Sequence, residues 1–277
     1  MAQKVWFITG CSKGFGREWA VAALERGDRV AASARDVATL EALTIRFGDA
    51  VLALALDVTD RSAVFAAVGA ADEYFGGLDV VVNNAGYGQF GFVEELSERE
   101  LRDQIETNLF GAVWVTQAAI PVLRRRGGGR ILQVSSIGGI TAFPMIGAYH
   151  ASKWALEGLS QSLAHEVAAF NIKVTIIEPT GYATDWAGSS ARHATPLGAY
   201  DDERRRFQAA RAARVSTPGD PRATSAVVLR LVDSEDPPLR IFFGDGPLAL
   251  ARADYEGRLA TWTKHEADSI EAHGPTS

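Results

Sequence analysis

A tyrosine and a lysine four residues apart are the first candidates for chemistry. Tyr149 and Lys153 lie near the start of a predicted helix, so both side chains fall on one helical face. A phenol with a pKa of about 10 is a poor base at neutral pH, but an adjacent ammonium would favour the phenolate and lower that pKa. Tyr149 could then take a proton from an alcohol or give one to a ketone oxygen. Alone, such a pair is common on helices and carries no function.

Two further polar residues could act with this pair. Ser136 follows a predicted strand, and its hydroxyl could hold a substrate oxygen and stabilise developing negative charge. Asn108 interrupts a predicted helix and could hold a water that relays protons to Lys153. The alternatives are that the serine only caps a helix and that the asparagine bonds locally. The residues gain meaning jointly, because they fall in order at the carboxyl ends of strands, where open α/β sheets bind ligands.

A glycine-rich loop joins the first predicted strand to the first predicted helix. In it, Gly10 could form the tight turn, Gly14 would let the backbone approach a pyrophosphate, and Gly16 would let the helix pack on the strand. The free N–H groups of the helix N-terminus favour an anion. The spacing G-x-x-x-G-x-G differs from the standard G-x-G-x-x-G, and a plain turn is the alternative. The residues expected to contact a dinucleotide here are Gly10, Ser12, Lys13, Gly14, Phe15 and Gly16.

The end of the second predicted strand favours NADP(H) over NAD(H). An acidic residue there would accept hydrogen bonds from a ribose 2′-hydroxyl and repel a 2′-phosphate, but the strand ends at Ala34. Arg35 could pair with the phosphate through its guanidinium group, and Lys13 could supply a second cation. The alternatives are that both cations are solvated surface charges, and that Asp36 turns toward the ribose instead of capping the next helix. In such a complex, the positive charge of an oxidised nicotinamide would lie beside Tyr149 and would further favour its phenolate form.

The elements that must position these residues alternate along the chain. Short apolar runs and longer amphipathic stretches take turns, which is typical of a parallel sheet with helices on both faces. We predict an α/β fold, namely a doubly wound, Rossmann-like, mostly parallel seven-stranded sheet in one domain over residues 1–277. Pro218 could start a further helix. Strands are predicted over 5–9, 29–33, 51–56, 78–83, 130–135, 173–178 and 240–243, and helices over 15–26, 60–75, 98–125, 147–170, 201–214 and 251–272.

Composition limits the partners and the compartment. The net charge of −6 argues against a nucleic-acid binder, and no apolar run is long enough to span a bilayer. Cys11 is the single cysteine, so no internal disulfide can form, and a cytoplasmic location without a signal peptide is expected. No metal site is predicted. Residues 180–215 are expected to form a lid over the sheet edge, and 250–277 a C-terminal helix with a loose tail from Gly274.

Together these motifs closely resemble the short-chain dehydrogenase/reductase family, in its single-domain branch, over residues 5–243. The resemblance implies an NADP(H)-dependent oxidoreductase that moves a hydride between nicotinamide and a carbonyl or secondary alcohol, the CH–OH class of donors. It implies that Asn108, Ser136, Tyr149 and Lys153 form a catalytic tetrad, with Lys153 also bonding the nicotinamide ribose. It adds Asp57 beside the adenine, the segment Asn83–Gly86 beside the cofactor, and Thr184 at the carboxamide. The further cofactor contacts that it implies are Asp57, Val58, Asn84, Ala85, Gly86, Tyr149, Lys153, Pro179 and Thr184.

One departure from the family pattern is visible. The family usually has Pro-Gly after the sixth strand, whereas this chain has Pro179-Thr180 with Gly181 one place later. This difference concerns the shape of the nicotinamide pocket and not the reaction class. The family also commonly forms dimers or tetramers through the two long helices, here 98–125 and 147–170, so a homodimer or homotetramer is expected.

The expected substrate pocket is apolar. Its walls would come from 137–146, 87–92 and the lid after Thr184, and we expect a hydrophobic ketone or secondary alcohol, such as a steroid-, retinoid- or aryl-ketone-like compound. Arg192 and His193 in the lid could instead hold an acidic group, and the apolar residues could be plain core. The predicted substrate contacts are Ser136, Tyr149, Phe90, Phe143, Met145 and Trp186, with Phe92 and Ile146 also apolar.

Two other functions compete with this prediction. Some proteins of this fold bind NADP(H) as sensors or scaffolds without catalysis, and retention of Asn108, Ser136, Tyr149 and Lys153 argues against that. A lyase or epimerase that uses the nicotinamide transiently usually carries a larger substrate domain, for which 277 residues leave no room.

Overall fold

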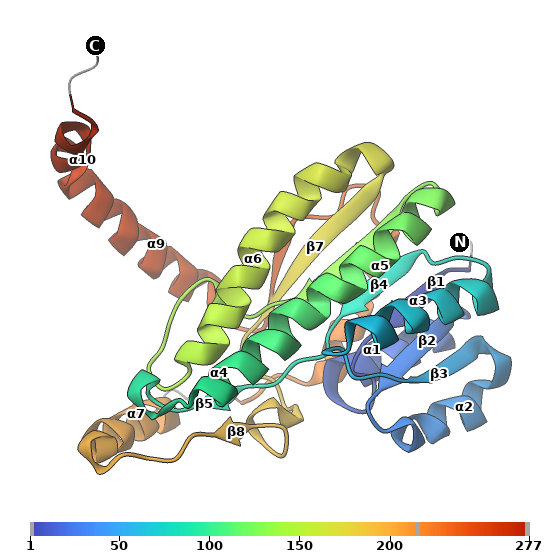
Figure 1. Ribbon diagram of the computed structural model, residues 1–277, viewed down its shortest axis with the longest axis horizontal. Coiled ribbons are helices and arrows are strands. Elements are labelled where there is room, and N and C mark those ends of the chain that lie inside the picture. Colours follow the sequence, from blue (N-terminus) through green and yellow to red (C-terminus); the bar gives the residue numbers. More distant parts are fainter. Residues whose placement is uncertain (1–2, 214–216, 275–277) are drawn as a thin grey trace.

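The computed structural model describes residues 3–213 and 217–274 and has a seven-stranded parallel sheet at its centre (Figure 1). The strand order is β3-β2-β1-β4-β6-β7-β9, and every pair in it is parallel. The chain thus winds outward from β1 in one direction and then from β4 in the other. The predicted doubly wound, Rossmann-like fold in a single domain is confirmed.

The elements follow the predicted alternation closely. Three parts of the predicted chain lie outside the described residues, namely residues 1–2, Arg214 and residues 275–277. The strands are β1 (Val5–Ile8), β2 (Arg29–Ala34), β3 (Val51–Ala55), β4 (Val80–Asn83), β5 (Gln89–Phe90), β6 (Gly129–Val134), β7 (Ile172–Pro179), β8 (Arg192–His193) and β9 (Arg240–Phe243). The α-helices are α1 (Gly14–Glu25), α2 (Glu41–Phe47), α3 (Arg61–Phe75), α4 (Glu98–Ile105), α5 (Gly111–Arg126), α6 (Gly147–Val167), α7 (Asp201–Ala213), α8 (Ser225–Asp233), α9 (Pro247–Lys264) and α10 (Glu266–His273).

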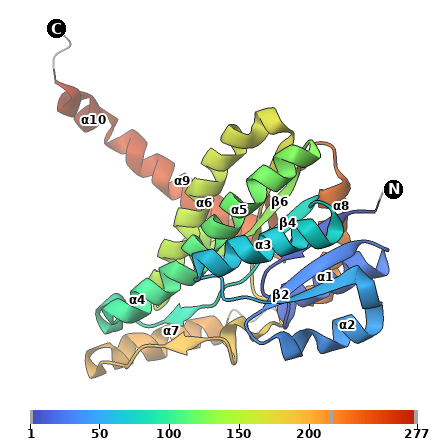
Figure 2. The same ribbon diagram turned by 45° about the vertical axis from the view of Figure 1, so that its right-hand side comes forward.

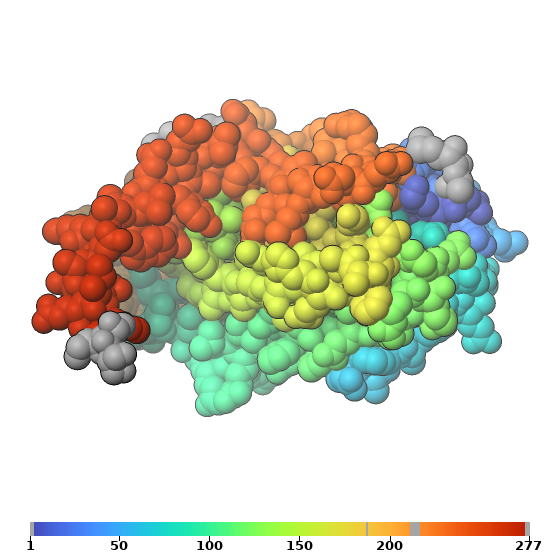
Figure 3. Space-filling view, turned by 90° about the horizontal axis from the view of Figure 1, so that it is seen from above, coloured from blue at the N-terminus to red at the C-terminus, as the bar shows by residue number. Residues whose placement is uncertain are grey.

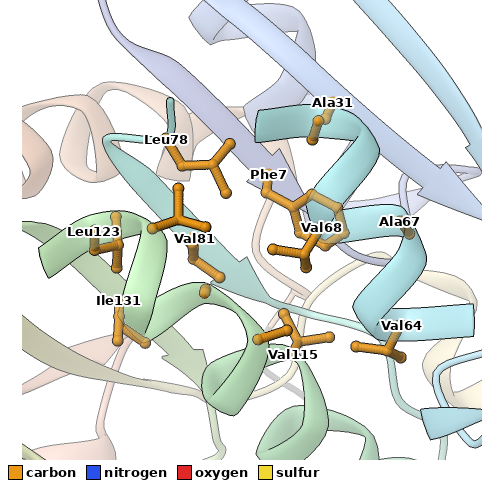
Figure 4. Packing of buried hydrophobic residues seen from close by; sticks show 14 of the residues in the cluster. Phe7, Ala31, Val64, Ala67, Val68, Leu78, Val81, Val115, Leu123 and Ile131 are labelled. Atoms are coloured by element: carbon orange, nitrogen blue, oxygen red, sulfur yellow. The ribbon is translucent and has the colours of Figure 1, made fainter. Parts of the chain in front are cut away.

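Two hydrophobic cores cover the two faces of the sheet. Because successive strand residues point to opposite faces, Val5 and Phe7 of β1 enter one core and Trp6 and Ile8 enter the other. The first core packs α3, α5 and α6 on the sheet, and Figure 4 shows Phe7 against Val68 of α3 within it. The second packs α1, α2 and α8 on the opposite face. Burial on both faces explains the continuous apolar runs of the strands.

Three boundaries differ from the predictions. The helix expected at Pro218 begins instead with a 3₁₀ turn at Pro221, because the Asp220 side chain caps that turn at the N–H of Arg222. The predicted C-terminal helix is two helices, α9 and α10, separated at His265. The predicted helix over 98–125 contains a π-helical segment, η4 (Glu106–Phe110), between α4 and α5.

The C-terminal helices leave the body of the molecule. Figures 1 and 2 show α9 starting beside β9 and α6 and then projecting outward with α10 at its end. In Figure 3 the same segment, in red, forms one end of the surface. Leu259 and Trp262 are more than half exposed there. Across the part of the chain that the structure describes, no helix is both long and apolar enough to cross a membrane.

Candidate active site

The glycine loop between β1 and α1 has the geometry that its sequence predicts. Gly10 and Gly14 have φ values of 71° and 60°, in the left-handed region that favours glycine. A Cβ on Gly16 would lie 2.5 Å from Asn84 Nδ2 and from the Gly10 carbonyl oxygen, so only glycine lets α1 pack this closely on the loop. A side chain is excluded where a dinucleotide would need close backbone approach. These observations fit the loop to a pyrophosphate.

The loop is tied to the end of β4. Thr9 Oγ1 accepts hydrogen bonds from the backbone N–H groups of Asn84 at 2.9 Å and Ala85 at 3.0 Å. The Asn84 side chain donates to the Thr9 carbonyl oxygen at 2.8 Å. Because β1 and β4 mark the point where the strand order reverses, these bonds fix the crevice in which such sheets bind ligands.

Of the groups that could bind the phosphates of a cofactor, only some are already bonded within the protein. The N-terminus of α1 has no side-chain cap, which leaves its first N–H groups available to a ligand. Arg35 is exposed at the tip of β2, and Asp36 caps the following 3₁₀ turn at Ala38 N, as predicted. Lys13 instead reaches the lid, where its Nζ lies 2.9 Å from Asp185 Oδ2 and 2.8 Å from Ser189 Oγ.

The residues expected near the adenine and the carboxamide lie along the same sheet edge. Asp57 is exposed after β3 and accepts hydrogen bonds from Thr59, while Val58 is buried against Gly111. Pro179 ends β7, and Thr184 follows in the lid. The Thr184 methyl group lies 3.6 Å from where a Cβ on Gly14 would be, so the lid meets the glycine loop.

Tyr149 and Lys153 are buried together on α6. The Lys153 Nζ lies 5.7 Å from the centre of the Tyr149 ring and donates to the Val134 carbonyl oxygen at 2.8 Å. Both side chains therefore face the carboxyl end of β6, as their spacing predicts. Gly86 borders the pair, because a Cβ there would lie 3.8 Å from Lys153 Nζ.

The ionisation of this pair differs from the expectation. Burial raises the pKa of Tyr149 to about 12, and a hydrogen bond with Ser136 opposes this. Burial also lowers the pKa of Lys153 to about 8, with the charge of Glu157 opposing. Desolvation of the phenolate outweighs the nearby Lys153 ammonium, which is bonded to a carbonyl oxygen, so the ammonium alone does not lower the pKa of Tyr149. Tyr149 is a neutral phenol at pH 7.

Ser136 and Asn108 come to the same place from different elements. Ser136 Oγ caps the short 3₁₀ turn η5 (Ile137–Gly139) at Gly138 N, 3.0 Å away, and also lies beside Tyr149. Asn108 lies in the π-helical segment η4, and its side chain bonds both the N–H and the C=O of Tyr87. Its Nδ2 also donates to Ser152 Oγ at 3.2 Å. The asparagine therefore links the loop after β4 to α6, and does not bond locally.

His150 is a site residue that sequence reasoning missed. Its Nδ1 lies 2.7 Å from the Gly138 carbonyl oxygen, and its Nε2 accepts the Phe143 N–H at 2.8 Å. Burial lowers the pKa of His150, so the ring is neutral, with Nδ1 as donor and Nε2 as acceptor. It braces the segment between Ser136 and Tyr149. In the sequence, the only signal for His150 was its position next to Tyr149.

The predicted apolar pocket residues divide into two groups. Trp186 covers Tyr149 with ring centres 4.9 Å apart and also contacts Phe90 at 5.4 Å. Phe143 instead packs with Ile137, Ile140 and Ala251 in a separate small cluster. Met145 has a φ of 69°, and its carbonyl oxygen accepts the Gly91 N–H at 2.7 Å. Of the predicted apolar contacts, Trp186 therefore lies against the Tyr149 ring, and Phe90 packs behind Trp186.

The segment predicted as a lid, described over residues 180–213, is anchored by contacts between distant parts of the chain. The carboxylate of Glu95 is fully buried and pairs with Arg204 of α7, while also accepting the Leu197 N–H. Strand β8 pairs with β5, a second small sheet that the sequence did not predict. Arg192, considered as a cation for acidic substrates, lies 3.3 Å from Asp103 and 4.5 Å from the Tyr87 ring centre. Its charge is therefore already matched.

The unusual Thr180 is accommodated by Gly244, the glycine that follows the neighbouring strand β9. Thr180 Oγ1 donates to the Phe243 carbonyl oxygen at 3.3 Å and lies 2.0 Å from where a Cβ on Gly244 would be. The departure from Pro-Gly thus changes packing between the ends of β7 and β9. Within residues 3–213 and 217–274, no group of three or more His, Cys, Asp or Glu side chains is placed to hold a metal ion.

Comparison with known proteins identifies the family. Residues 4–195 match the family model described as short chain dehydrogenase. Oxidoreductase BOA17 of Botryotinia fuckeliana is 42% identical over 259 residues, covering 93% of each chain. A crystal structure of a short-chain dehydrogenase from Streptomyces avermitilis superposes with a TM-score of 0.89 at 37% identity, covering 97% of this chain and 99% of that one. This chain belongs to the short-chain dehydrogenase family of oxidoreductases.

A more distant relative adds a ligand-bound structure. An alcohol dehydrogenase from the archaeon Thermococcus sibiricus, solved in complex with 5-hydroxy-NADP, has a TM-score of 0.73 at 28% identity and covers 87% of this chain and 96% of its own. The family likeness therefore extends over nearly the whole of both chains.

Proposed function

We propose that the protein is an NADP(H)-dependent reductase of hydrophobic ketones, or in reverse a dehydrogenase of the corresponding secondary alcohols. The observation that carries this proposal is the placement of the buried Tyr149 phenol beside Lys153 and Ser136 at the carboxyl edge of the sheet. A neutral phenol is a proton donor, which is what reduction of a carbonyl requires.

The cofactor would lie along the crevice between β1 and β4. Gly10, Gly14 and the N-terminus of α1 would hold the pyrophosphate, and Arg35 with Lys13 would hold a 2′-phosphate. The neutral Ala34 at the tip of β2 supports NADP(H) over NAD(H). When bound, the nicotinamide supplies or accepts the hydride.

The remaining steps are performed by the protein's own side chains. Ser136 would donate a hydrogen bond to the substrate oxygen, and Tyr149 would deliver its proton to that oxygen as negative charge develops. Lys153 stabilises the phenolate that remains, because an ammonium favours the charged form of a neighbouring phenol. Asn108 holds the Tyr87 backbone and α6 in register around this group.

The substrate assignment is supported by the surroundings of Tyr149. Phe90 is buried and Trp186 covers the phenol ring, so the group that approaches Tyr149 would contact aromatic carbon. Arg192 is paired with Asp103 and is a weak candidate for an acidic group. Residues 180–215 would act as the lid that admits substrate.

We also propose a homo-oligomer in the cytoplasm. Leu101, Phe110 and Trp154 are exposed on α4, η4 and α6, the elements expected to form the subunit contact. Light scattering on the purified chain would give the subunit number, and substitution of Phe110 by glutamate should reduce it.

The decisive test is NADPH-linked turnover over a set of apolar and acidic ketones. Tyr149→Phe should reduce kcat at least about a hundredfold while leaving NADPH affinity unchanged. Tyr74→Phe, at an exposed tyrosine on α3, is the matched control and should behave as wild type. NADPH binding without turnover on any ketone would favour a sensor or scaffold, and activity on acidic ketones alone would refute the apolar pocket.

A further inference from the structure

A row of polar side chains continues along α6 from Tyr149 and Lys153 toward the C-terminal end of the helix. Tyr149, Lys153, Glu157 and Gln161 are spaced four residues apart, so they lie along one face of the helix. Glu157 is 6% exposed, and Glu178 on the adjoining strand β7 is 1% exposed. The mechanism above uses the first two members of the row and assigns nothing to the buried acids.

One arginine faces both buried carboxyl groups. The Nε of Arg240, on β9, lies 3.0 Å from Glu157 Oε2 and 3.5 Å from Glu178 Oε1. Its guanidinium also donates to Gln161 Oε1 at 2.9 Å. Burial of two carboxyl groups beside this arginine disfavours a second negative charge and raises the pKa of both acids.

The contacts indicate which acid is charged. Burial raises the pKa of Glu157, but Arg240 Nε donates to its Oε2 at 3.0 Å, which favours the carboxylate. Burial, followed by the charge of Glu157, raises the pKa of Glu178 to about 8. Glu178 is therefore the protonated member at neutral pH, and Glu157 carries the negative charge.

Glu157 lies next to the turn after Ser136 and one helical turn from Lys153. A Cβ on Gly139 would lie 2.9 Å from Glu157 Cγ and 2.7 Å from Ser135 Oγ, so this glutamate packs directly under the turn that begins at Ser136. One helical turn away, its charge favours the ammonium form of Lys153. The other groups facing Lys153 are Tyr149, the Val134 carbonyl and, across Gly86, Asn108, while His150 faces Gly138 and Phe143.

We propose that Glu157 is a positioning residue of this active site. Its carboxylate, oriented by Arg240, keeps Lys153 charged within a buried site and supports the turn that carries Ser136. Glu178 contributes as the protonated partner that allows Glu157 to be buried with one arginine. The link to catalysis rests on the proposed function, whereas the effect on Lys153 can be measured without turnover.

The direct test is a pH titration of Lys153 in the whole protein by NMR of ¹³Cε-labelled lysine. The chain has only five lysines, and Lys153→Met identifies the resonance. Glu157→Gln should lower the titration midpoint of Lys153 by about one pH unit. Glu178→Gln should lower it by less than Glu157→Gln does, because a Glu178 carboxyl with a pKa of about 8 is only partly ionised at that midpoint. Glu166→Gln, at an exposed position of the same helix, is the matched control.

Arg240→Gln provides a second variant if Glu157→Gln does not fold. Removal of the arginine would favour protonation of Glu157, so the Lys153 midpoint should again fall. In active protein, the part of the pH profile of kcat/KM that reports the ionisation of Lys153 should move to lower pH by the same amount. An unchanged midpoint in every folded variant would overturn the proposal. A shifted midpoint in a protein without ketone reductase activity would instead retain this role and reject the proposed function.

Discussion

Tyr149 and Lys153 show how burial acts on two neighbouring groups of opposite charge type. It raises the pKa of the phenol to about 12 and lowers that of the lysine to about 8, so each is driven toward its neutral form. Tyr149 therefore carries a proton that a carbonyl oxygen could receive. In the reverse, alcohol-oxidising direction, the positive charge of an oxidised nicotinamide would add to that of Lys153 in stabilising the phenolate.

The tip of β2 offers a test of cofactor choice. Ala34→Asp would place a carboxylate beside Arg35, where it would repel a 2′-phosphate and accept hydrogen bonds from a 2′-hydroxyl. We expect NADPH affinity to fall roughly 10- to 100-fold and NADH affinity to rise. Titration of both cofactors by fluorescence would measure this. Equal losses for the two cofactors would indicate damage to the fold rather than a change of preference.

Gly16 and Gly158 form a matched pair for testing the glycine loop. A Cβ on Gly16 would lie 2.5 Å from two neighbouring atoms, whereas a Cβ on Gly158, exposed within α6, would meet nothing within 4 Å. Gly16→Ala should therefore lower the free energy of unfolding by roughly 1–3 kcal/mol. Gly158→Ala should raise it by about 0.5–1 kcal/mol. Urea denaturation would measure both, and similar effects at the two positions would contradict the close packing described for α1.

At the scale of elements, the lid and the glycine loop share an ion pair. The Lys13–Asp185 pair is nearly half exposed on both sides, so it is worth about 0.2–1 kcal/mol. If Lys13 binds the 2′-phosphate, Asp185→Asn frees the lysine and should tighten NADPH binding about 1.5- to 5-fold, with no change for NADH. Asp202→Asn removes a comparable exposed pair with Arg205 on α7 and should leave both affinities unchanged. Weaker NADPH binding in Asp185→Asn would show that the ion pair supports the site instead.

The order of elements was predictable from sequence, and their finer contacts were not. The spacing of apolar residues, together with the turn residues that interrupt it, is enough to predict the seven main strands, because each buried strand is a local apolar run. The β5–β8 pair joins residues more than a hundred positions apart, and the π-helical turn at Asn108 depends on bonds to Tyr87. The same holds within the site. The Tyr149–Lys153 spacing is a local pattern, whereas the joining of Glu157 and Arg240 requires the completed sheet.

At the scale of the whole molecule, the C-terminal arm divides into a docked and an undocked part. Ala251 is buried, and Arg258 donates to the Ile140 carbonyl oxygen and lies over the Trp154 ring, whereas α10 is exposed throughout. Deletion of residues 265–277 should therefore change Tm by no more than about 2 °C. Deletion from Pro247 should lower Tm by several degrees. Differential scanning calorimetry would measure both, and a large loss from the shorter deletion would place hidden stabilising contacts in α10.

The intrinsic fluorescence of the Trp186 indole should report on the state of the candidate site. Among the described residues its Nε1 is buried and has no hydrogen-bond partner, and the ring rests on Tyr149 and Phe90. A ligand that displaces this side chain would transfer it to water, and the emission maximum should move to longer wavelength. Because the chain has six tryptophans, the difference from Trp186→Phe isolates this contribution. Stopped-flow emission would then time the opening of the site in each catalytic cycle without any label.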